Sequence, residues 1–175
     1  MSLWVFGYGS LLWNPGFEVA ESQIATLPGY ARSFCMVSIH HRGTEDAPGL
    51  VLALDEAPDA ACLGVALRAA PGTEDATLAM LRERELISSA YYEAILTVQL
   101  QDGRALEAVS YVVDRGHQQY CSYSLEEQAQ IIARAVGGRG PNTEYLHNTA
   151  SHLAEIGIAD EDLTWLSRRV AELGV

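Results

Sequence analysis

The feature that most constrains the fold is a pair of strand-like segments joined by an Asp-Gly turn. Residues 94–100 and 106–113 are rich in aliphatic and β-branched side chains, and they flank Gln101-Asp102-Gly103-Arg104. Aspartate and glycine both tolerate positive φ, so this pair between two such segments predicts a β-hairpin. We therefore expect an antiparallel sheet in this part of the chain.

Four further segments have the short apolar pattern of strands. They are residues 2–7, 31–40, 50–54 and 62–67. The last two are separated by residues 55–59, where acidic residues and Pro58 predict a turn. Strands should therefore dominate the first two-thirds of the chain.

Helical patterns place one helix among the strands and three near the C-terminal end. Residues 74–87, 142–156 and 160–173 carry three of these patterns, and the remaining one starts at residue 124. Ser124 and Glu127 form a capping-box pattern, and Gly137-Gly138 is expected to end that helix in a left-handed turn. Asn142 is the expected N-cap of the next helix, and Gly157 its stop.

Length and composition fit one packed domain. The chain has 175 residues, of which 49% are hydrophobic. A chain of this size buries about two-thirds of the surface that it exposes when unfolded. We find no internal repeat, low-complexity tract or linker. The prediction is a single α+β domain over residues 1–175, mostly antiparallel.

The charge of the chain excludes some classes of partner. Eleven basic residues stand against 23 acidic ones, which gives a formal net charge of −12. A protein that binds nucleic acid needs a cationic face, and an anionic membrane surface repels an acidic chain. We therefore expect neither a nucleic acid nor a membrane as a partner, and favour a small-molecule substrate.

The cysteines indicate a reducing compartment. Cys35, Cys62 and Cys121 are odd in number, widely spaced and outside any Cys-x-x-Cys pair. This pattern argues against a disulfide framework and against a structural zinc site. The sequence also shows no basic leader followed by an apolar segment and no 18-residue apolar span. We expect a cytoplasmic protein.

A glycine-containing segment follows the first predicted strand. Its residues are Gly7, Tyr8, Gly9, Ser10, Leu11 and Leu12. Two glycines after a strand let the backbone turn sharply and present N–H groups to an anion or oxyanion. Leu12 stands where a dinucleotide fingerprint or a nucleophile elbow requires glycine, so neither motif fits. A tight turn that only connects two elements is the alternative.

The first predicted helix carries an acidic residue on its apolar face. At 100° per residue, Glu85 falls between Leu78 and Leu81, whereas Glu83 and Arg84 point elsewhere. A carboxylate in that position needs a partner or has a raised pKa. The structural interpretation is an ion pair with Arg82. The catalytic interpretation is a general acid and base, for which a raised pKa is suitable.

Other polar clusters favour structure over metal binding. His40 and His41 have no metal-ligand partner at the usual spacing, and His147 and His152 lie on different faces of their helix. The glycine-rich stretch at residues 140–146 lacks the lysine of a phosphate-binding loop. Hydrogen bonding and helix capping explain these residues, and no metal site is expected.

These segments, taken in order, resemble the ChaC family of γ-glutamylcyclotransferases. The resemblance rests on residues 5–13, 29–34, 41–43, 48–51, 84–91 and 142–146, and it covers about residues 3 to 155. Two positions depart from eukaryotic relatives. Residues 86–90 lack the Gly-Gly pair that precedes Tyr91 in those relatives, and Cys35 stands where they often have tryptophan. Both departures concern substrate preference more than reaction class.

The resemblance implies a fold, a reaction and a set of site residues. The fold is a mostly antiparallel closed β-barrel surrounded by helices. The reaction is that of a lyase: glutathione is converted to 5-oxoproline and Cys-Gly without a metal or a cofactor. Glu85 would move the proton, the backbone of residues 7–12 would hold the γ-glutamyl unit, and Tyr8, Ser10 and Tyr145 would add polar contacts.

Two alternatives remain open from the sequence. One is a cyclotransferase for other γ-glutamyl peptides or amines. The other is a non-catalytic regulator of cation transport. A pure binding protein has no need of an acid on the apolar face of a helix, so Glu85 disfavours the second alternative. The sequence does not indicate an oligomeric state.

Overall fold

The computed structural model describes residues 2–86 and 90–174 and divides into two compact units. The first unit comprises Met1–Arg32 and Ala53–Gln118, and the second comprises Ser33–Leu52 and Gln119–Val175. The single domain over residues 1–175 stays a prediction.

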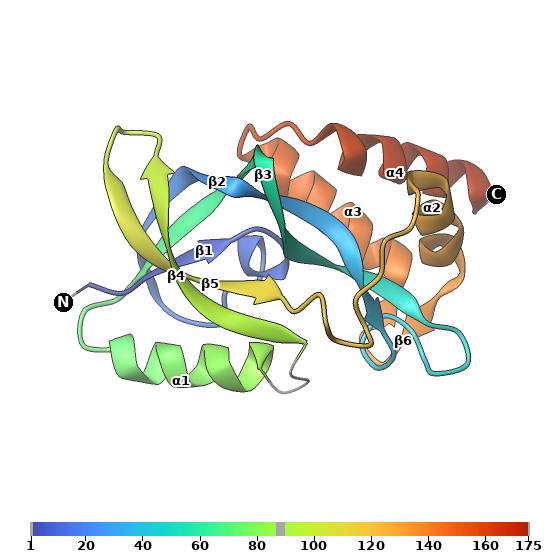
Figure 1. Cartoon of the computed structure of the whole chain (residues 1–175), viewed down its shortest axis with the longest axis horizontal. Helices are drawn as coiled ribbons and strands as arrows, with labels where there is room; N and C mark the ends of the chain where they lie inside the picture. The colour runs from blue at the N-terminus through green and yellow to red at the C-terminus, as the bar shows by residue number, and fades with distance from the viewer. Residues whose placement is uncertain (1, 87–89, 175) are drawn as a thin grey trace. The chain divides into compact units, whose positions relative to one another are not determined.

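Strands and helices follow the expected order (Figure 1). The strands of the barrel are β1 (Trp4–Gly7), β2 (Val19–Ser38), β3 (Gly49–Ala69), β4 (Tyr91–Leu100) and β5 (Ala105–Val113). The helices are α1 (Glu74–Glu85), α2 (Leu125–Arg134), α3 (Asn142–Glu155) and α4 (Glu161–Leu173). A short 3-10 helix, η1 (Ser10–Leu12), and a two-stranded ribbon of β6 (Val136–Gly137) and β7 (Gly140–Pro141) complete the described elements.

The five longer strands close into a barrel. Their order is β1-β3-β2-β4-β5, and β5 returns to pair with both β1 and β3. The pairs β1–β3, β2–β4 and β4–β5 are antiparallel, whereas β5 meets β1 and β3 in parallel at Val5↔Val109 and Leu54↔Val112. The expected closed, mostly antiparallel barrel with helices is confirmed.

The predicted hairpin is present in full. The register between β4 and β5 runs from Tyr91↔Val113 to Gln99↔Ala105. In the connecting loop, Gly103 has a φ of 97° and its N–H donates to the carbonyl of Leu100 over 3.0 Å. The local pattern of Asp and Gly was therefore sufficient to predict this pairing.

The predicted turn at residues 55–59 is wrong. These residues continue β3, which runs without a break from Gly49 to Ala69. Arg115 stabilises the extended backbone, because its guanidinium donates to the Asp55 carboxylate over 2.6 Å and to the Glu56 carbonyl over 2.7 Å. Polar residues are compatible with a half-exposed strand when such a partner is present. The predicted strand at residues 31–40 also starts earlier, at Val19.

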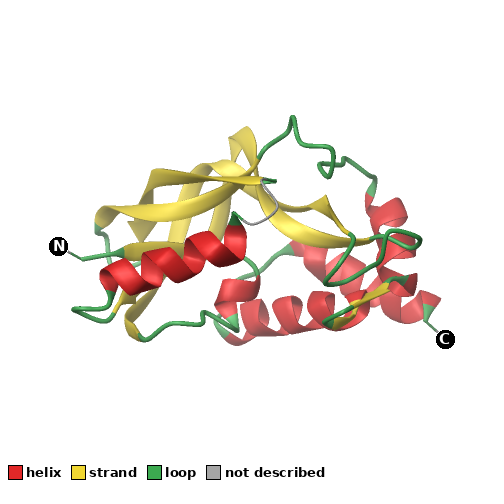
Figure 2. Cartoon of the chain, turned by 90° about the horizontal axis from the view of Figure 1, so that it is seen from below, coloured by secondary structure: helices red, strands yellow, loops and turns green. Residues whose placement is uncertain are grey.

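Helix α1 lies along the strands of the first unit (Figure 2). Its Leu81 is fully buried and packs in a cluster with Val5, Leu11, Val109 and Tyr111. The predicted start after Thr73 is confirmed, and the described part of the helix ends at Glu85. The predicted end at residue 87 lies outside the described residues.

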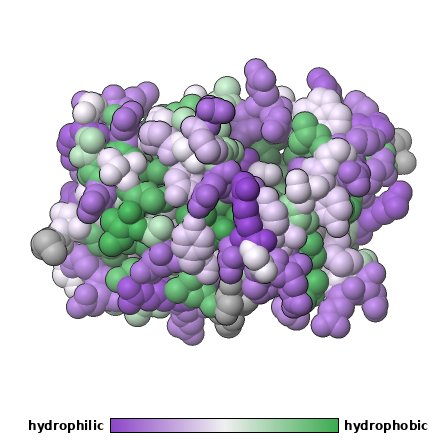
Figure 3. All heavy atoms as spheres, in the orientation of Figure 1, coloured by the Kyte–Doolittle hydropathy of each residue, from purple (hydrophilic) through white to green (hydrophobic). Residues whose placement is uncertain are grey.

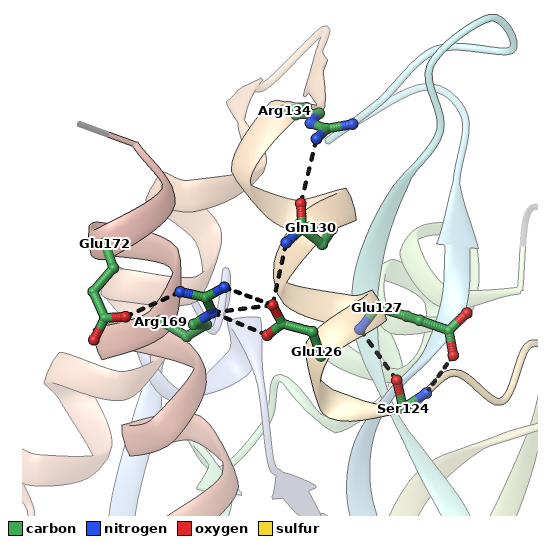
Figure 4. A network of polar contacts seen from close by, with 7 residues as sticks. All are labelled: Ser124, Glu126, Glu127, Gln130, Arg134, Arg169 and Glu172. Carbon is green, nitrogen blue, oxygen red and sulfur yellow. Dashed lines mark hydrogen bonds and ion pairs between the residues drawn. The ribbon is translucent and has the colours of Figure 1, made fainter.

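The second unit contains α2, α3 and α4, and polar contacts join two of these helices (Figure 4). The capping box is confirmed, because Ser124 Oγ accepts from the Glu127 N–H and the Glu127 carboxylate accepts from the Ser124 N–H. Arg169 on α4 donates to the Glu126 carboxylate on α2 over 2.7 Å and also binds Glu172.

Two predicted helix ends in this unit are wrong. Helix α2 ends at Arg134, and Gly137 continues into β6 instead of ending the helix. Asn142 occupies the first turn of α3, and its side chain bonds to the backbone of Leu50 and not to the helix end. Pro141 is the N-cap instead.

The predicted stop at Gly157 is confirmed. The N–H groups of Gly157 and Ile158 donate to the carbonyls of Ala154 and Leu153 over 3.1 and 2.8 Å, which is a Schellman arrangement. Asp160 then caps α4 by accepting from the Leu163 N–H.

Polar and charged side chains cover much of the face seen in Figure 3. Among the described residues, no helix combines the length and the apolar character that crossing a membrane would require.

Candidate active site

The glycine-containing segment forms a turn between β1 and η1. Gly7 ends β1 opposite Val65 of β3, and the Leu12 N–H donates to the Gly9 carbonyl over 2.9 Å. Leu12 therefore uses its N–H inside the turn. Within the described part of the chain, the N–H groups of Gly9, Ser10 and Leu11 have no protein acceptor. These three donors are consistent with the predicted role of the segment.

Tyr8 fixes this turn on the barrel. Its side chain is buried, and its hydroxyl donates to the carbonyl of Tyr111 on β5 over 3.4 Å. The Tyr8 carbonyl accepts from Arg32 on β2 over 2.9 Å. Neighbouring strands therefore hold the backbone between Gly7 and Ser10 at two points.

Glu85 is the last residue of α1 and is only partly shielded from water. Its side chain is 17% exposed, whereas Leu81, one turn earlier, is fully buried. Glu85 follows Leu81 by one turn of α1, as the helical period predicts, and its side chain is neither fully buried nor fully exposed. A partly buried acid in this position can exchange protons with a substrate. Its raised pKa stays a prediction.

The structural partner considered for Glu85 binds another acid. Arg82 donates twice to the Glu93 carboxylate on β4, over 3.0 Å for each bond. Arg84 instead lies beside Glu85, with its Nε 3.6 Å from Glu85 Oε1. The two arginines of the Arg-Glu-Arg-Glu run therefore have different partners.

Arg84 also contacts the turn after β1, and sequence reasoning missed this. Its guanidinium donates to Ser10 Oγ over 2.9 Å and to the Asn14 carbonyl over 2.8 Å. Arg84, expected to point away from the apolar stripe, is nearly as shielded from solvent as Glu85 and reaches the segment that starts at Ser10. Ser10 and Glu85, two residues predicted to act together, thus share one neighbour.

A second group of polar side chains adjoins this end of α1. The Tyr111 hydroxyl donates to the Glu93 carboxylate over 2.9 Å. Burial raises the pKa of Tyr111, and the negative charges of Glu93 and Glu85 raise it further, so the hydroxyl stays protonated near neutral pH. The hydrogen bonds from Arg82 lower the pKa of Glu93. No local sequence signal marked Tyr111, because a tyrosine in an apolar strand resembles a core residue.

Tyr145, the remaining predicted site residue, belongs to the second unit. It is 7% exposed, and its hydroxyl accepts from the Leu52 N–H on β3 over 3.1 Å. Its ring meets Phe34 edge-on, and the Arg42 guanidinium lies 5.6 Å from its centre. These contacts are structural. A contact between Tyr145 and a substrate stays a prediction.

Asn142, about one turn earlier on α3, also binds the backbone of β3. Its side-chain amide accepts from the Leu50 N–H and donates to the Leu50 carbonyl, both over 2.8 Å. Asn142 and Tyr145 therefore fasten one face of α3 to alternate residues of β3.

The loop after β2, which contains His41 and Arg42, is also tightly packed. Arg42 is buried and donates to the Pro141 carbonyl over 3.1 Å and to Glu144 over 3.3 Å. Burial lowers the pKa of His41, and electrostatic interactions with Arg139, His40 and Arg42 lower it further. A side chain at Gly137 would overlap the backbone of His41 and Gly43, so the approach of β6 to this loop requires glycine. The hydrogen-bonding interpretation of this loop is supported.

The ChaC-like protein family accounts for nearly the whole chain, since its sequence profile matches residues 3–173. The chain belongs to this family. It is 37% identical to the glutathione-specific γ-glutamylcyclotransferase of Escherichia coli (strain K12) over 98% of this chain and 74% of that protein. It is 33% identical to γ-glutamylcyclotransferase 2-3 of Arabidopsis thaliana over 99% and 90% of the two chains.

Solved structures confirm the ChaC-like fold. The crystal structure of a selenomethionine-labelled γ-glutamyl cyclotransferase specific to glutathione from yeast superposes with a TM-score of 0.88. The two chains are 24% identical, and the match covers 98% of this chain and 96% of the yeast chain. The identity is low enough that this likeness concerns the fold alone.

Proposed function

We propose that this ChaC-like protein is a γ-glutamylcyclotransferase that converts glutathione to 5-oxoproline and Cys-Gly. The curated relatives at 37% and 33% identity bear γ-glutamylcyclotransferase names, and the E. coli relative is named as specific for glutathione. The observation that carries the proposal is the position of Glu85. Its carboxylate lies at the end of α1, partly exposed, and it shares Arg84 with the turn that contains Ser10.

The reaction needs no nucleophile from the protein. The α-amine of the γ-glutamyl unit attacks its own γ-carbonyl, a new C–N bond closes the five-membered ring, and the original amide C–N bond breaks. Because both reacting groups belong to one molecule, the enzyme mainly holds a reactive conformer and moves protons. At neutral pH the α-amine is protonated, so it must lose a proton before it attacks.

We assign the transfer of protons to Glu85. Its carboxylate accepts a proton from the α-ammonium group and delivers it to the departing nitrogen of the Cys-Gly portion. The attacking nitrogen loses a second proton after the new C–N bond forms, and the released amine takes up one proton to leave as an ammonium group. The net reaction neither consumes nor releases a proton at this residue. General acid–base catalysis of this kind contributes about 10²- to 10⁴-fold to a rate.

We assign substrate binding to the turn at residues 7–12. The N–H groups of Gly9, Ser10 and Leu11 have no acceptor in the described part of the chain and would bind the γ-glutamyl unit or the oxyanion. Removing one such donor in comparable sites costs about 10²- to 10³-fold in kcat. Tyr8 fixes the turn, and Tyr145 is retained as a predicted contact with the substrate.

The cysteines support a reducing compartment, and we propose the cytoplasm. Cys35, Cys62 and Cys121 are free thiols. Burial raises the pKa of the Cys121 thiol to about 11, so it is protonated and unreactive near neutral pH. Such thiols persist where glutathione is kept reduced, which is also where its degradation would take place.

The test is direct measurement of product. The purified protein is incubated with glutathione and with a panel of γ-glutamyl dipeptides and amines, and 5-oxoproline is quantified by mass spectrometry. We expect product from glutathione. If 5-oxoproline forms only from other γ-glutamyl compounds, glutathione is not the substrate and one of those compounds takes its place. If none of the compounds gives 5-oxoproline, the result favours a non-catalytic regulator. Glu83→Gln, a neighbouring exposed glutamate, serves as the matched control for Glu85→Gln.

A further inference from the structure

Arg84 makes three polar contacts with groups on two sides of it. Its Nη1 donates to the Asn14 carbonyl over 2.8 Å, its Nη2 donates to Ser10 Oγ over 2.9 Å, and its Nε lies 3.6 Å from Glu85 Oε1. The side chain is 19% exposed, so these contacts are partly shielded from solvent. All of its nitrogen atoms are therefore directed at the segment after β1 or at the carboxylate of Glu85.

These contacts require the planar fork of arginine. A guanidinium presents five N–H donors in fixed directions and can bind a hydroxyl, a carbonyl and a carboxylate at once. A lysine ammonium at this position is a single point of charge on a flexible stem. It can keep the positive charge near Glu85, but it cannot reach Ser10 and Asn14 at the same time.

We propose that Arg84 is a positioning residue, which holds the segment from Ser10 to Asn14 at the end of α1 and keeps the Glu85 carboxylate ionised for its first proton transfer. The inference rests on the proposed function, in which Glu85 must begin each turnover without a proton. A cation within about 4–6 Å of a carboxylate favours its charged form. Arg84 Nε lies inside that range.

Charged and polar groups on the neighbouring elements are paired with one another. On α1 itself, Arg82 is committed to Glu93 by two hydrogen bonds. On β4, Glu93 is an anion paired with Arg82 and with the Tyr111 hydroxyl. On β5, Tyr111 stays protonated and neutral. Arg84, with its Nε 3.6 Å from Glu85 Oε1, places a positive charge beside that carboxylate.

The first experiment measures the ionisation of Glu85 without any turnover. Protein labelled with ¹³C at the glutamate side-chain carboxyls is titrated by NMR, and the Glu85 signal is identified by its absence from Glu85→Gln. We expect Arg84→Ala to raise the pKa of Glu85 by about one unit. Arg84→Lys should leave this pKa close to that of the wild type. Arg104→Ala is the control, because Arg104 pairs with Glu21 and Asp102 at another place in the same unit.

The second experiment separates charge from positioning by kinetics. We expect the acid limb of the kcat/KM profile to move upward by about one pH unit in Arg84→Ala, with a loss of about tenfold on that limb. Arg84→Lys should keep the wild-type acid limb and raise KM severalfold, because the segment from Ser10 to Asn14 loses its bonds. Thermal unfolding monitors the fold, and Arg84→Gln replaces Arg84→Ala if the alanine variant does not fold.

Two results would overturn the inference. One is a Glu85 pKa that is the same in Arg84→Ala and in the wild type. The other is an Arg84→Lys variant with the same acid limb and the same KM as Arg84→Ala, which would reduce Arg84 to a packing role. Failure of the proposed function has a different signature: the wild type itself releases no 5-oxoproline, while the NMR titration still decides the effect of Arg84 on Glu85.

Discussion

Two regions of the molecule carry the residues that resemble one family, and they use polar side chains in opposite ways. At the end of α1, Glu85 and Arg84 are 17% and 19% exposed, and they meet each other at 3.6 Å. In α3, Asn142 is fully buried and Tyr145 nearly so, and both bind backbone groups of β3. Partly exposed charged groups suit a reaction with a substrate, whereas buried groups that bind the backbone stabilise the fold.

The largest expected effect tests the first region. Glu85→Gln keeps the shape of the side chain but cannot carry a proton, so we expect 5-oxoproline release to fall by at least about 100-fold. The free energy of unfolding should change by less than about 1 kcal/mol, since the carboxylate is partly exposed and its contact with Arg84, at 3.6 Å, is longer than a hydrogen bond. Release rates and urea unfolding are measured on the same samples. A Glu85→Gln enzyme with nearly wild-type turnover would remove Glu85 from the mechanism.

The next effect tests the second region, and the observable is stability. Asn142→Ala removes two hydrogen bonds and leaves the N–H and carbonyl of Leu50 without their partner, so we expect a loss of about 3 kcal/mol in the free energy of unfolding. Activity per folded molecule should stay close to that of the wild type. Asn148→Ala, on the same helix, is the control. A stable Asn142→Ala protein with impaired turnover would assign Asn142 to the reaction instead.

Tyr145→Phe tests two roles of one residue in the second region, its bond to β3 and its predicted contact with the substrate. The change removes the hydroxyl that accepts from the Leu52 N–H, so we expect a loss of about 1 kcal/mol in the free energy of unfolding. The predicted contact with the substrate adds a second expectation, an increase in KM for glutathione with little change in kcat. Unchanged stability would contradict the attachment to β3, and an unchanged KM would remove Tyr145 from the substrate site.

The smallest expected effect concerns the ion pair between Arg82 and Glu93. Hydrogen bonds from Arg82 lower the pKa of Glu93 in the folded state, so the pair stabilises the protein above the unfolded pKa of this carboxyl. This contribution is lost as the pH falls through the lower, folded pKa. Glu93→Gln should therefore be less stable than the wild type at pH 7, by less than Tyr145→Phe is. The difference should shrink at acid pH, and urea unfolding at pH 7 and pH 3 measures it.

Patterns held within a few residues were predictable from the sequence. The Asp-Gly hairpin, the capping box at Ser124 and the stop at Gly157 each depend on near neighbours, and all three are present. Errors arose where the deciding partner is distant. Asp55 continues a strand because Arg115, 60 residues later, binds it. Asn142 does not cap α3, because Leu50 lies 92 residues away in sequence but next to it in the fold.

The candidate site also contains features that follow from local sequence and contacts that depend on distant residues. The place of Glu85 on α1 was predictable from the helical period, whereas its catalytic role was implied by the family resemblance and stays a prediction. The role that we infer for Arg84 was not predictable, since the hydroxyl of Ser10 lies 74 residues earlier in the sequence. Tyr111 and Glu93 are also joined across two strands, and neither residue type is unusual in a strand. Contacts between distant segments are invisible to local spacing and period.

In the loop after β2, which contains Arg42, backbone segments pack closely against one another, and this affects how members of a protein family are recognised from sequence. A side chain at Gly49 would overlap the carbonyl of Arg42, and one at Gly137 would overlap His41 and Gly43. Neither glycine belongs to the site proposed for the reaction. A larger side chain at either position would require the backbone to shift, whether or not the chain is catalytically active. A signature motif can therefore record steric exclusion, and a homologue that has lost its catalytic acid would still be recognised by it.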